Sequence, residues 1–149
     1  MSDLRELYQE VILDHNKYPH NFGKLEGADH HADGFNPLCG DKLTIYVNLD
    51  DDTVTNVSFL GSGCAISKAS ASLMTDAVKG KTLAEVRSLF DQFLALVTDD
   101  DAPVDDAVLG KLAVFSGVRD YPMRVKCASL AWHTLRAAFD NHHEVVTTE

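Results

Sequence analysis

Two runs of alternating apolar and polar residues, separated by three aspartates, limit the folds that are open to this chain. Residues 43–49 alternate in hydrophobicity, and Val57 and Phe59 alternate within residues 53–60, which is the period of two expected of a strand with one buried face. The aspartates at 50–52 supply a turn between the runs, so together they predict an antiparallel hairpin. Because Cys39 and Cys64 flank the hairpin, its folding brings both to the same end of the sheet.

Helical patterns surround the hairpin, with apolar residues spaced three and four positions apart. The region from Tyr18 to Asn36 has no strong period and predicts a loop, although a short edge strand near His30 to Phe35 fits its composition. A capping box from Thr82 to Glu85 opens the third predicted helix. The predicted helices run from Leu4 to Ile12 and on towards Pro19, from about Ala65 to Val78, from Leu83 to about Thr98, from Val108 to Gly117, and from Pro122 to about Asn141.

This order of one helix, then strands, then further helices predicts an α+β fold, a small antiparallel β-sheet with helices packed on one face. The 149 residues match the size of a single domain. No apolar run approaches the roughly 20 residues that a membrane span needs. The N-terminus has no basic segment followed by an apolar one, so we expect a cytoplasmic protein with no signal peptide and no membrane contact.

The formal net charge of −10 argues against a nucleic-acid partner, because such proteins neutralise phosphates with clustered lysines and arginines. A protein partner is the better expectation. Much of the excess charge lies in the acidic runs at 50–52, 99–101 and 105–106, which we interpret as solvated loops.

The chain contains three cysteines, an odd number that argues against a disulfide framework and favours thiol or metal chemistry. Cys39 and Asp41 place a thiolate and a carboxylate two positions apart across a glycine, and Cys64 and Cys127 lie near predicted helix starts. Three sulfurs and one oxygen suit a tetrahedral zinc site. Because no Cys-x-x-Cys pair occurs, such a site exists only if the fold assembles it from three places.

Exchange at this predicted site is favoured by its ligand types. Cys64 is expected to have a lowered thiol pKa, since the N–H groups at a helix start favour the thiolate. Three thiolates and one carboxylate around Zn²⁺ carry a formal charge of about −2, which is costly to bury without nearby cations. Arg124 and Lys126, beside Cys127, are candidates to supply them, and the alternative is two solvated basic residues. Because Asp41 is a harder ligand than a thiolate, the site should open easily, freeing a cysteine for sulfur exchange with a persulfide.

The histidines give a weaker signal. The adjacent His30 and His31 are further candidate ligands, but exposed loop histidines are the better interpretation. At 100° per residue His133 lies well round the last helix from Cys127, so we expect it on the surface. A cysteine hydrolase is disfavoured, because no histidine has a motif that ties it to a cysteine.

Three motifs carry a family resemblance. Cys39-Gly40-Asp41, the segment Gly61 to Ser72 and the segment Tyr121 to Trp132 resemble, in order, the cysteine motifs of the IscU/NifU-like iron–sulfur cluster assembly proteins. Within that family the chain is most similar to the SufU branch. IscU-type scaffolds have a histidine before the third cysteine, where this chain has Lys126, and a Leu-Pro-Pro-Val-Lys segment, where it has Asp120-Tyr121-Pro122-Met123-Arg124.

The resemblance implies one IscU/SufU-like domain over residues 1–149, of the SufE/NifU-like fold, with a SufU-type insertion around 95–117. It also implies zinc as the cofactor and a SufS-type cysteine desulfurase as the partner, together with downstream SUF assembly components. By the resemblance, the desulfurase donates a histidine to the zinc and frees Cys39 to accept the persulfide, and Arg124 helps at that encounter. The implied zinc ligands are Cys39, Asp41, Cys64 and Cys127.

The sequence therefore predicts a zinc-dependent sulfur acceptor, a sulfurtransferase or sulfur carrier that stimulates the desulfurase, with Cys39, Arg124 and Lys126 taking part in transfer. The alternative is an IscU-type scaffold that binds iron, or builds a transient [2Fe–2S] cluster on the same four ligands and hands it on. The missing histidine and the missing chaperone segment count against the scaffold. A metal-stabilised fold with no transfer role is a third reading.

Overall fold

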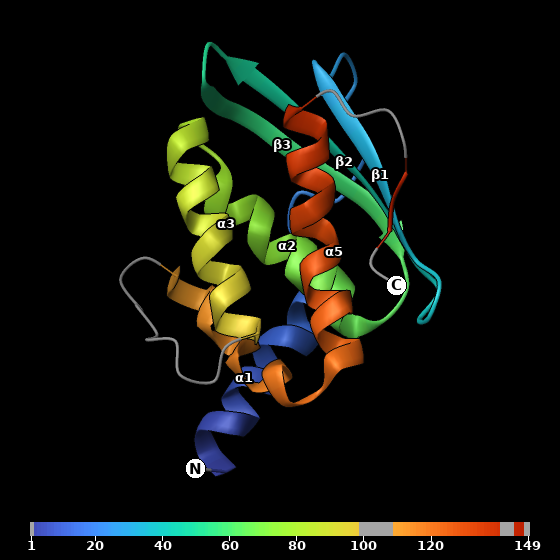
Figure 1. The fold of residues 1–149 in the computed structure, drawn as a ribbon, viewed down its shortest axis with the longest axis vertical. Coiled ribbons are helices and arrows are strands. Elements are labelled where there is room, and N and C mark those ends of the chain that lie inside the picture. Colours follow the sequence, from blue (N-terminus) through green and yellow to red (C-terminus); the bar gives the residue numbers. More distant parts are fainter. Residues whose placement is uncertain (1, 99–108, 141–144, 148–149) are drawn as a thin grey trace.

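The structure, a computed structural model, describes residues 2–98, 109–140 and 145–147, with a four-stranded sheet in the order β3-β2-β1-β4 (Figure 1). The helices are α1 (Ser2–Lys17), α2 (Ala65–Val78), α3 (Leu83–Thr98), the 3₁₀ helix η1 (Gly110–Asp120) and α5 (Pro122–Phe139). The strands are β1 (His30–Asn36), β2 (Asp41–Asp50), β3 (Thr53–Ser62) and β4 (Val146–Thr147).

The predicted hairpin is confirmed, because β2 and β3 pair antiparallel from Asp50 with Thr53 to Lys42 with Ser62. Its alternating side chains divide as expected: Leu43, Ile45 and Val47 of β2 are buried, and the residues between them are exposed or half-buried. The closed end of the hairpin therefore lies far from Cys39 and Cys64, which are together at its open end.

A full strand, β1, occupies the end of the segment that the sequence analysis assigned mainly to a loop. It pairs antiparallel with β2 over seven residues, and β4 pairs parallel to its other side, so β1 is not the sheet edge. Its inward positions are Ala32, Gly34 and Asn36. A methyl group at Gly34 would overlap the hydroxyl of Thr134 on α5, so this small residue lets the helix approach the sheet. Such a face lacks the bulky residues that mark a strand in sequence.

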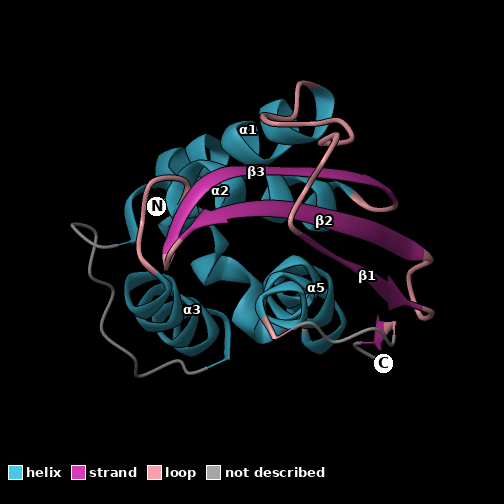
Figure 2. Ribbon diagram, turned by 90° about the horizontal axis from the view of Figure 1, so that it is seen from above, coloured by secondary structure: helices cyan, strands magenta, loops and turns pink. Residues whose placement is uncertain are grey.

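Helices cover the buried face of the sheet, as predicted. Helix α5 contacts β1 and β2, α2 contacts β3 and packs between α1 and α5, and α3 packs against η1 and α5 (Figures 1 and 2). The core between them is aromatic, with the rings of Phe93 and Trp132 stacked at 4.6 Å. Cys64 and Cys127 thus lie on two helices, α2 and α5, that contact each other.

One of the predicted helices differs in the structure. The short helix expected to end at Gly117 is a 3₁₀ helix that continues to Asp120, one residue before the N-cap of α5. The acidic loop at 99–106, and with it much of the predicted insertion at 95–117, lies outside the described residues. Among the described helices, none has the length and apolar character that crossing a membrane requires.

Candidate metal centre

The loop that carries Cys39 is closed by the pairing of β1 with β2. Asn36 at the end of β1 lies directly opposite Asp41 at the start of β2, and the Gly40 N–H donates to the Asn36 carbonyl at 2.8 Å. Asp41 is fully buried, whereas Cys39 at the loop tip is half-buried. The carboxylate therefore lies deeper in the fold than the thiol at the loop tip.

Cys64 is the N-cap residue of α2, as the sequence predicted. Its sulfur accepts a hydrogen bond from the Ser67 N–H at 3.4 Å, and its own N–H donates to Asp41 Oδ1 at 2.7 Å. Gly63 makes this approach possible: its φ is +140°, and a methyl group there would overlap the Asp41 carboxylate. The corner before α2 thus holds Cys64 against Asp41.

Cys127, buried on α5, completes the group that we call the sulfur cluster, which consists of Cys39, Asp41, Cys64 and Cys127. The sulfurs of Cys127 and Cys39 are 3.1 Å apart, and the Cys64 sulfur is 3.6 Å from Asp41 Oδ2. Ligand atoms of Cys39, Asp41 and Cys127 all lie within 4.8 Å of one another. The fold thus brings together Cys39, Asp41 and Cys127, and Cys64 borders this group through its contact with Asp41.

The donor set and its spacing fit zinc. A tetrahedral site with zinc–sulfur distances of about 2.3 Å needs ligand atoms that lie three to four ångströms apart, in about the range observed. Within the described residues, Cys39, Asp41 and Cys127 form the one group of potential ligands whose ligand atoms all lie within 4.8 Å of one another. This group contains no histidine. That the four residues bind a metal remains a prediction.

The pKa values of the Cys64 and Cys127 thiols are shifted in opposite directions. The hydrogen bond from Cys127, with help from the Ser67 N–H, lowers the pKa of Cys64 in spite of its burial. The same hydrogen bond to Cys64, together with burial, raises the pKa of Cys127. In the metal-free chain a proton therefore stays on Cys127, among sulfurs and a carboxylate, where a cation would replace it.

The two basic residues predicted to assist the site lie on the first turns of α5. Arg124 is exposed, and its guanidinium lies 4.6 Å from the centre of the Tyr121 ring. Lys126 is half-buried and directly precedes Cys127. Their roles in sulfur transfer remain predictions.

The histidines differ in part from expectation. His31 is exposed on β1, with its ring centre 6.2 Å from that of Tyr46, and His30 is half-buried on the same strand. His133 is not a surface residue: it is half-buried with its ring 5.3 Å from that of Phe90 on α3, and this burial lowers its pKa. Helix α3 covers the side of α5 that the sequence analysis assigned to solvent.

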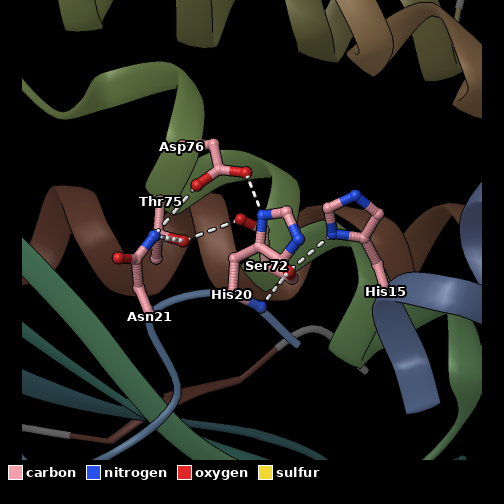
Figure 3. Close-up of polar contacts among 6 residues, drawn as sticks. All are labelled: His15, His20, Asn21, Ser72, Thr75 and Asp76. Atoms are coloured by element: carbon pink, nitrogen blue, oxygen red, sulfur yellow. Dashed lines mark hydrogen bonds and ion pairs between the residues drawn. The ribbon is translucent and has the colours of Figure 1, made fainter. Parts of the chain in front are cut away.

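Sequence reasoning missed Asn36, a fully buried side chain whose Nδ2 lies 3.6 Å from the Cys127 sulfur. A polar residue just before the Cys-Gly-Asp loop was the available signal, but the short strand suggested from the sequence stopped at Phe35, one residue before Asn36. It also missed a polar group on α2, shown in Figure 3, that we call the histidine cluster. Its members are His15, His20, Asn21, Ser72, Thr75 and Asp76.

Comparisons with known proteins agree with this arrangement. The family model described as the NifU-like N terminal domain matches residues 7–128. The chain is 41% identical over 138 residues to the iron–sulfur cluster assembly scaffold protein IscU of Streptococcus pyogenes serotype M1, covering 93% of this chain and 86% of that protein. It is 40% identical over 135 residues to the zinc-dependent sulfurtransferase SufU of Bacillus subtilis, covering 90% of each.

The fold has a solved counterpart as well. The crystal structure of a nitrogen-fixing NifU-like protein (N-terminal) from Brucella abortus superposes with a TM-score of 0.82 at 26% identity, covering 91% of this chain and 93% of that chain. The two functional names, scaffold and sulfurtransferase, come from relatives of nearly equal identity. Identity alone therefore does not choose between them.

Proposed function

Because the chain belongs to the family of the NifU-like N-terminal domain, whose relatives are named for iron–sulfur cluster assembly, we propose that it is a zinc-dependent sulfur acceptor. Its sulfur donor is a SufS-type cysteine desulfurase, and its product serves downstream SUF assembly components. The zinc ligands are Cys39, Asp41, Cys64 and Cys127. Bound zinc supplies the positive charge that keeps the three sulfurs deprotonated and offsets the buried carboxylate.

The observation that carries the proposal is the unequal placement of the four ligands. Asp41 and Cys127 are buried, and Cys64 is fixed at the start of α2 by hydrogen bonds on its sulfur and its N–H. Cys39 lies on a loop and is half-buried. It is the ligand that can swing towards a partner with the least disturbance of the fold.

Transfer is a thiol exchange. The Cys39 thiolate attacks the outer sulfur of a persulfide on the desulfurase cysteine, and an S–S bond forms to Cys39. The S–S bond of the donor breaks, and the donor cysteine leaves as a thiolate, so no external oxidant or reductant is consumed. Arg124, exposed on the first turn of α5, is available to an approaching partner, and Lys126 adds positive charge beside Cys127.

The runner-up is a scaffold that assembles a [2Fe–2S] cluster on the same four ligands. Its support comes from relatives named as scaffolds, at 41% and 37% identity. Against it stands Lys126, at the position before the third cysteine where IscU-type scaffolds have a histidine. A sulfur acceptor needs no ligand from this chain beyond the four named above. The residues present therefore favour the acceptor over the scaffold.

The test mixes the zinc-loaded protein with a SufS-type desulfurase and cysteine. Alanine production should rise many-fold, and peptide mass mapping should find one added sulfur on Cys39. Cys39→Ala should abolish both effects. The acceptor proposal is wrong if the native protein gives no stimulation or if Cys39→Ala stimulates fully. Anaerobic iron and sulfide test the scaffold separately, since they should then yield a coloured cluster that can be transferred to an apoprotein.

Asp41→Ala tests the exchangeable site. It removes the one oxygen ligand and also the acceptor for the Cys64 N–H. We expect a tighter or distorted metal site and a blocked exchange, seen as lost stimulation while zinc is retained. Asn56→Ala on the exposed face of β3 is the control, and an unchanged rate in Asp41→Ala would contradict the role given to the carboxylate.

A further inference from the structure

Asn36 joins the two parts of the fold that supply Cys39 and Cys127. It is the last residue of β1, and its side chain is fully buried on the face of the sheet that α5 covers. Its Oδ1 accepts a hydrogen bond from the Leu38 N–H at 3.1 Å, inside the loop that carries Cys39. Its Nδ2 donates to the Cys127 sulfur at 3.6 Å, a length that suits the large sulfur atom. One amide thus contacts both the loop and the helix.

The orientation of this amide is fixed by its surroundings. The Leu38 N–H is a donor, so only the amide oxygen can face it. The NH₂ group must then face Cys127, where the sulfur is an acceptor. Reversing the amide would place two donors together and leave the sulfur opposite an oxygen lone pair.

The cysteines consequently differ in the hydrogen bonds that their sulfurs receive. The Cys127 sulfur receives the Asn36 amide, and the Cys64 sulfur receives the Ser67 N–H. The Cys39 sulfur receives the Cys127 thiol at 3.1 Å, a hydrogen bond that ends when Cys127 is deprotonated, whereas the N–H donors to Cys127 and Cys64 remain. A hydrogen bond to a thiolate stabilises its charge and makes it a weaker nucleophile. Donors near a metal site also hold ligands in place.

We propose that Asn36 is a positioning residue that keeps Cys127 as a fixed ligand and thereby leaves Cys39 as the sulfur that exchanges. The inference rests on the proposed function and adds a determinant of which sulfur accepts. Asn36 takes no part in bond making. It acts through Cys127, by holding that sulfur against the loop and lowering its reactivity.

The main test variant is Asn36→Asp. An aspartate keeps the size of the side chain and an oxygen for the Leu38 N–H, but turns a carboxylate oxygen towards Cys127 in place of a donor. Asn36→Ser is the second variant. Its hydroxyl can still accept from the Leu38 N–H within the loop, but it is too short to reach the Cys127 sulfur as the amide does. Asn56→Asp, at an exposed position on β3, makes the same change of charge away from the site and is the control.

The first readout uses metal-free protein and does not depend on sulfur transfer. Under reducing anaerobic conditions, brief alkylation followed by peptide mapping gives the ratio of modification at Cys127 to that at Cys39. This ratio should rise about 2–10-fold in Asn36→Ser, which removes the hydrogen bond to Cys127 without adding charge. In Asn36→Asp the new carboxylate also disfavours the Cys127 thiolate, so that variant is judged chiefly by zinc affinity. The ratio compares two cysteines in the same molecules, so a general loosening of the fold, followed by circular dichroism, does not by itself produce it.

The second readout is zinc affinity, measured by competition with a chromogenic chelator, and the third is the site of the added sulfur after desulfurase treatment. Affinity should fall about 10–100-fold, and the added sulfur should divide between Cys39 and Cys127. If the native protein takes up no sulfur, the proposed function fails, but the alkylation ratio and zinc affinity still judge Asn36. If both variants match Asn56→Asp in the alkylation ratio and in zinc affinity, the inference is overturned while the proposed function stands.

Discussion

Helix α2 contacts two polar clusters whose buried polar groups are satisfied in different ways. At its first turn lies the sulfur cluster, and along its later turns lies the histidine cluster, where side chains from residues 15–21 meet Ser72, Thr75 and Asp76 (Figure 3). The second cluster satisfies its polar groups internally. The first gathers three sulfurs and a buried carboxylate and needs a cation.

The histidine cluster closes around one hydroxyl. The Ser72 hydroxyl accepts from the His20 N–H at 2.8 Å and shares a hydrogen bond of 2.6 Å with His15 Nδ1. Burial lowers the pKa of His15 and so favours its neutral form, in which Nδ1 can accept from the hydroxyl. The Asn21 amide donates to Thr75 and Asp76, both at 3.0 Å. The one carboxylate of this cluster, Asp76, is partly exposed and accepts from the Asn21 amide and the His20 ring, whereas the buried thiolates and carboxylate of the sulfur cluster cannot pair with one another.

Removing zinc should give the largest effect and should act on the sulfur cluster alone. An ion present at 1,000 times its dissociation constant stabilises the folded chain by about 4 kcal/mol, which corresponds to roughly 8–16 °C in Tm for a chain of this size. Calorimetry with and without a chelator measures the difference. Cys64→Ala should show little response to the chelator. Equal melting temperatures for the native protein would contradict the assignment of zinc to the sulfur cluster.

Ser72→Ala tests whether the internal hydrogen bonds of the histidine cluster stabilise the fold independently of zinc. It leaves the His20 N–H and His15 Nδ1 without their buried partner, and we expect a loss of about 1–3 kcal/mol in the free energy of unfolding. Denaturant titration measures it. In the part of the chain that the structure describes, the buried hydroxyl of Ser58 has no partner, so Ser58→Ala is a control that should cost little. Zinc affinity should stay unchanged in both variants, and a large fall in Ser72→Ala would show that the clusters are coupled.

Acidification should weaken the histidine cluster through His15. Burial and the neighbouring His20 lower the pKa of His15, with Lys111 acting in the same sense and Asp76 and Asp14 opposing. The folded chain then binds this proton less readily than the unfolded chain. Stability from neutral His15 is complete above the ordinary histidine pKa of about 6.5 and is lost as pH falls below it.

The slope from one such group cannot exceed about 1.4 kcal/mol per pH unit. Urea titrations from pH 7.5 to roughly 5 on metal-free protein isolate it from metal release. His15→Gln retains a side-chain acceptor and should flatten this part of the profile. An identical profile in that variant would assign the pH dependence to other groups.

Asp76→Asn should have the smallest effect. The contact of Asp76 with His20 is close, at 2.5 Å, and is an ion pair only when His20 is protonated; the two side chains are 44% and 51% exposed. Pairs at such exposure contribute about 0.2–1 kcal/mol, and less at high salt. Unfolding in low and high salt measures this contribution. A loss as large as that of Ser72→Ala would mean that the charge, and not the buried hydroxyl, holds the cluster together.

Sequence patterns were reliable where they reflect the local geometry of the backbone. The alternation in residues 43–60 predicted the hairpin, the capping box at Thr82 and Glu85 is present as reciprocal hydrogen bonds, and Cys64 is the N-cap of α2. The sequence offered β1 only as a short edge strand near His30 to Phe35, because Gly34 and Asn36 give its inner face no apolar period. The surface assignment of His133 was wrong because nothing local indicates where α3 packs.

The sequence by itself determined the elements, the order of the cysteines along them and the kinds of ligand available. Only the tertiary structure decided which polar atoms meet, as Asn36 meets Cys127 and His15 meets Ser72. The physical reason is that periods of 2 and 3.6 are properties of a few neighbouring residues. A contact between distant residues depends on how far each helix is shifted and turned on the sheet, and packing of the whole core sets those positions.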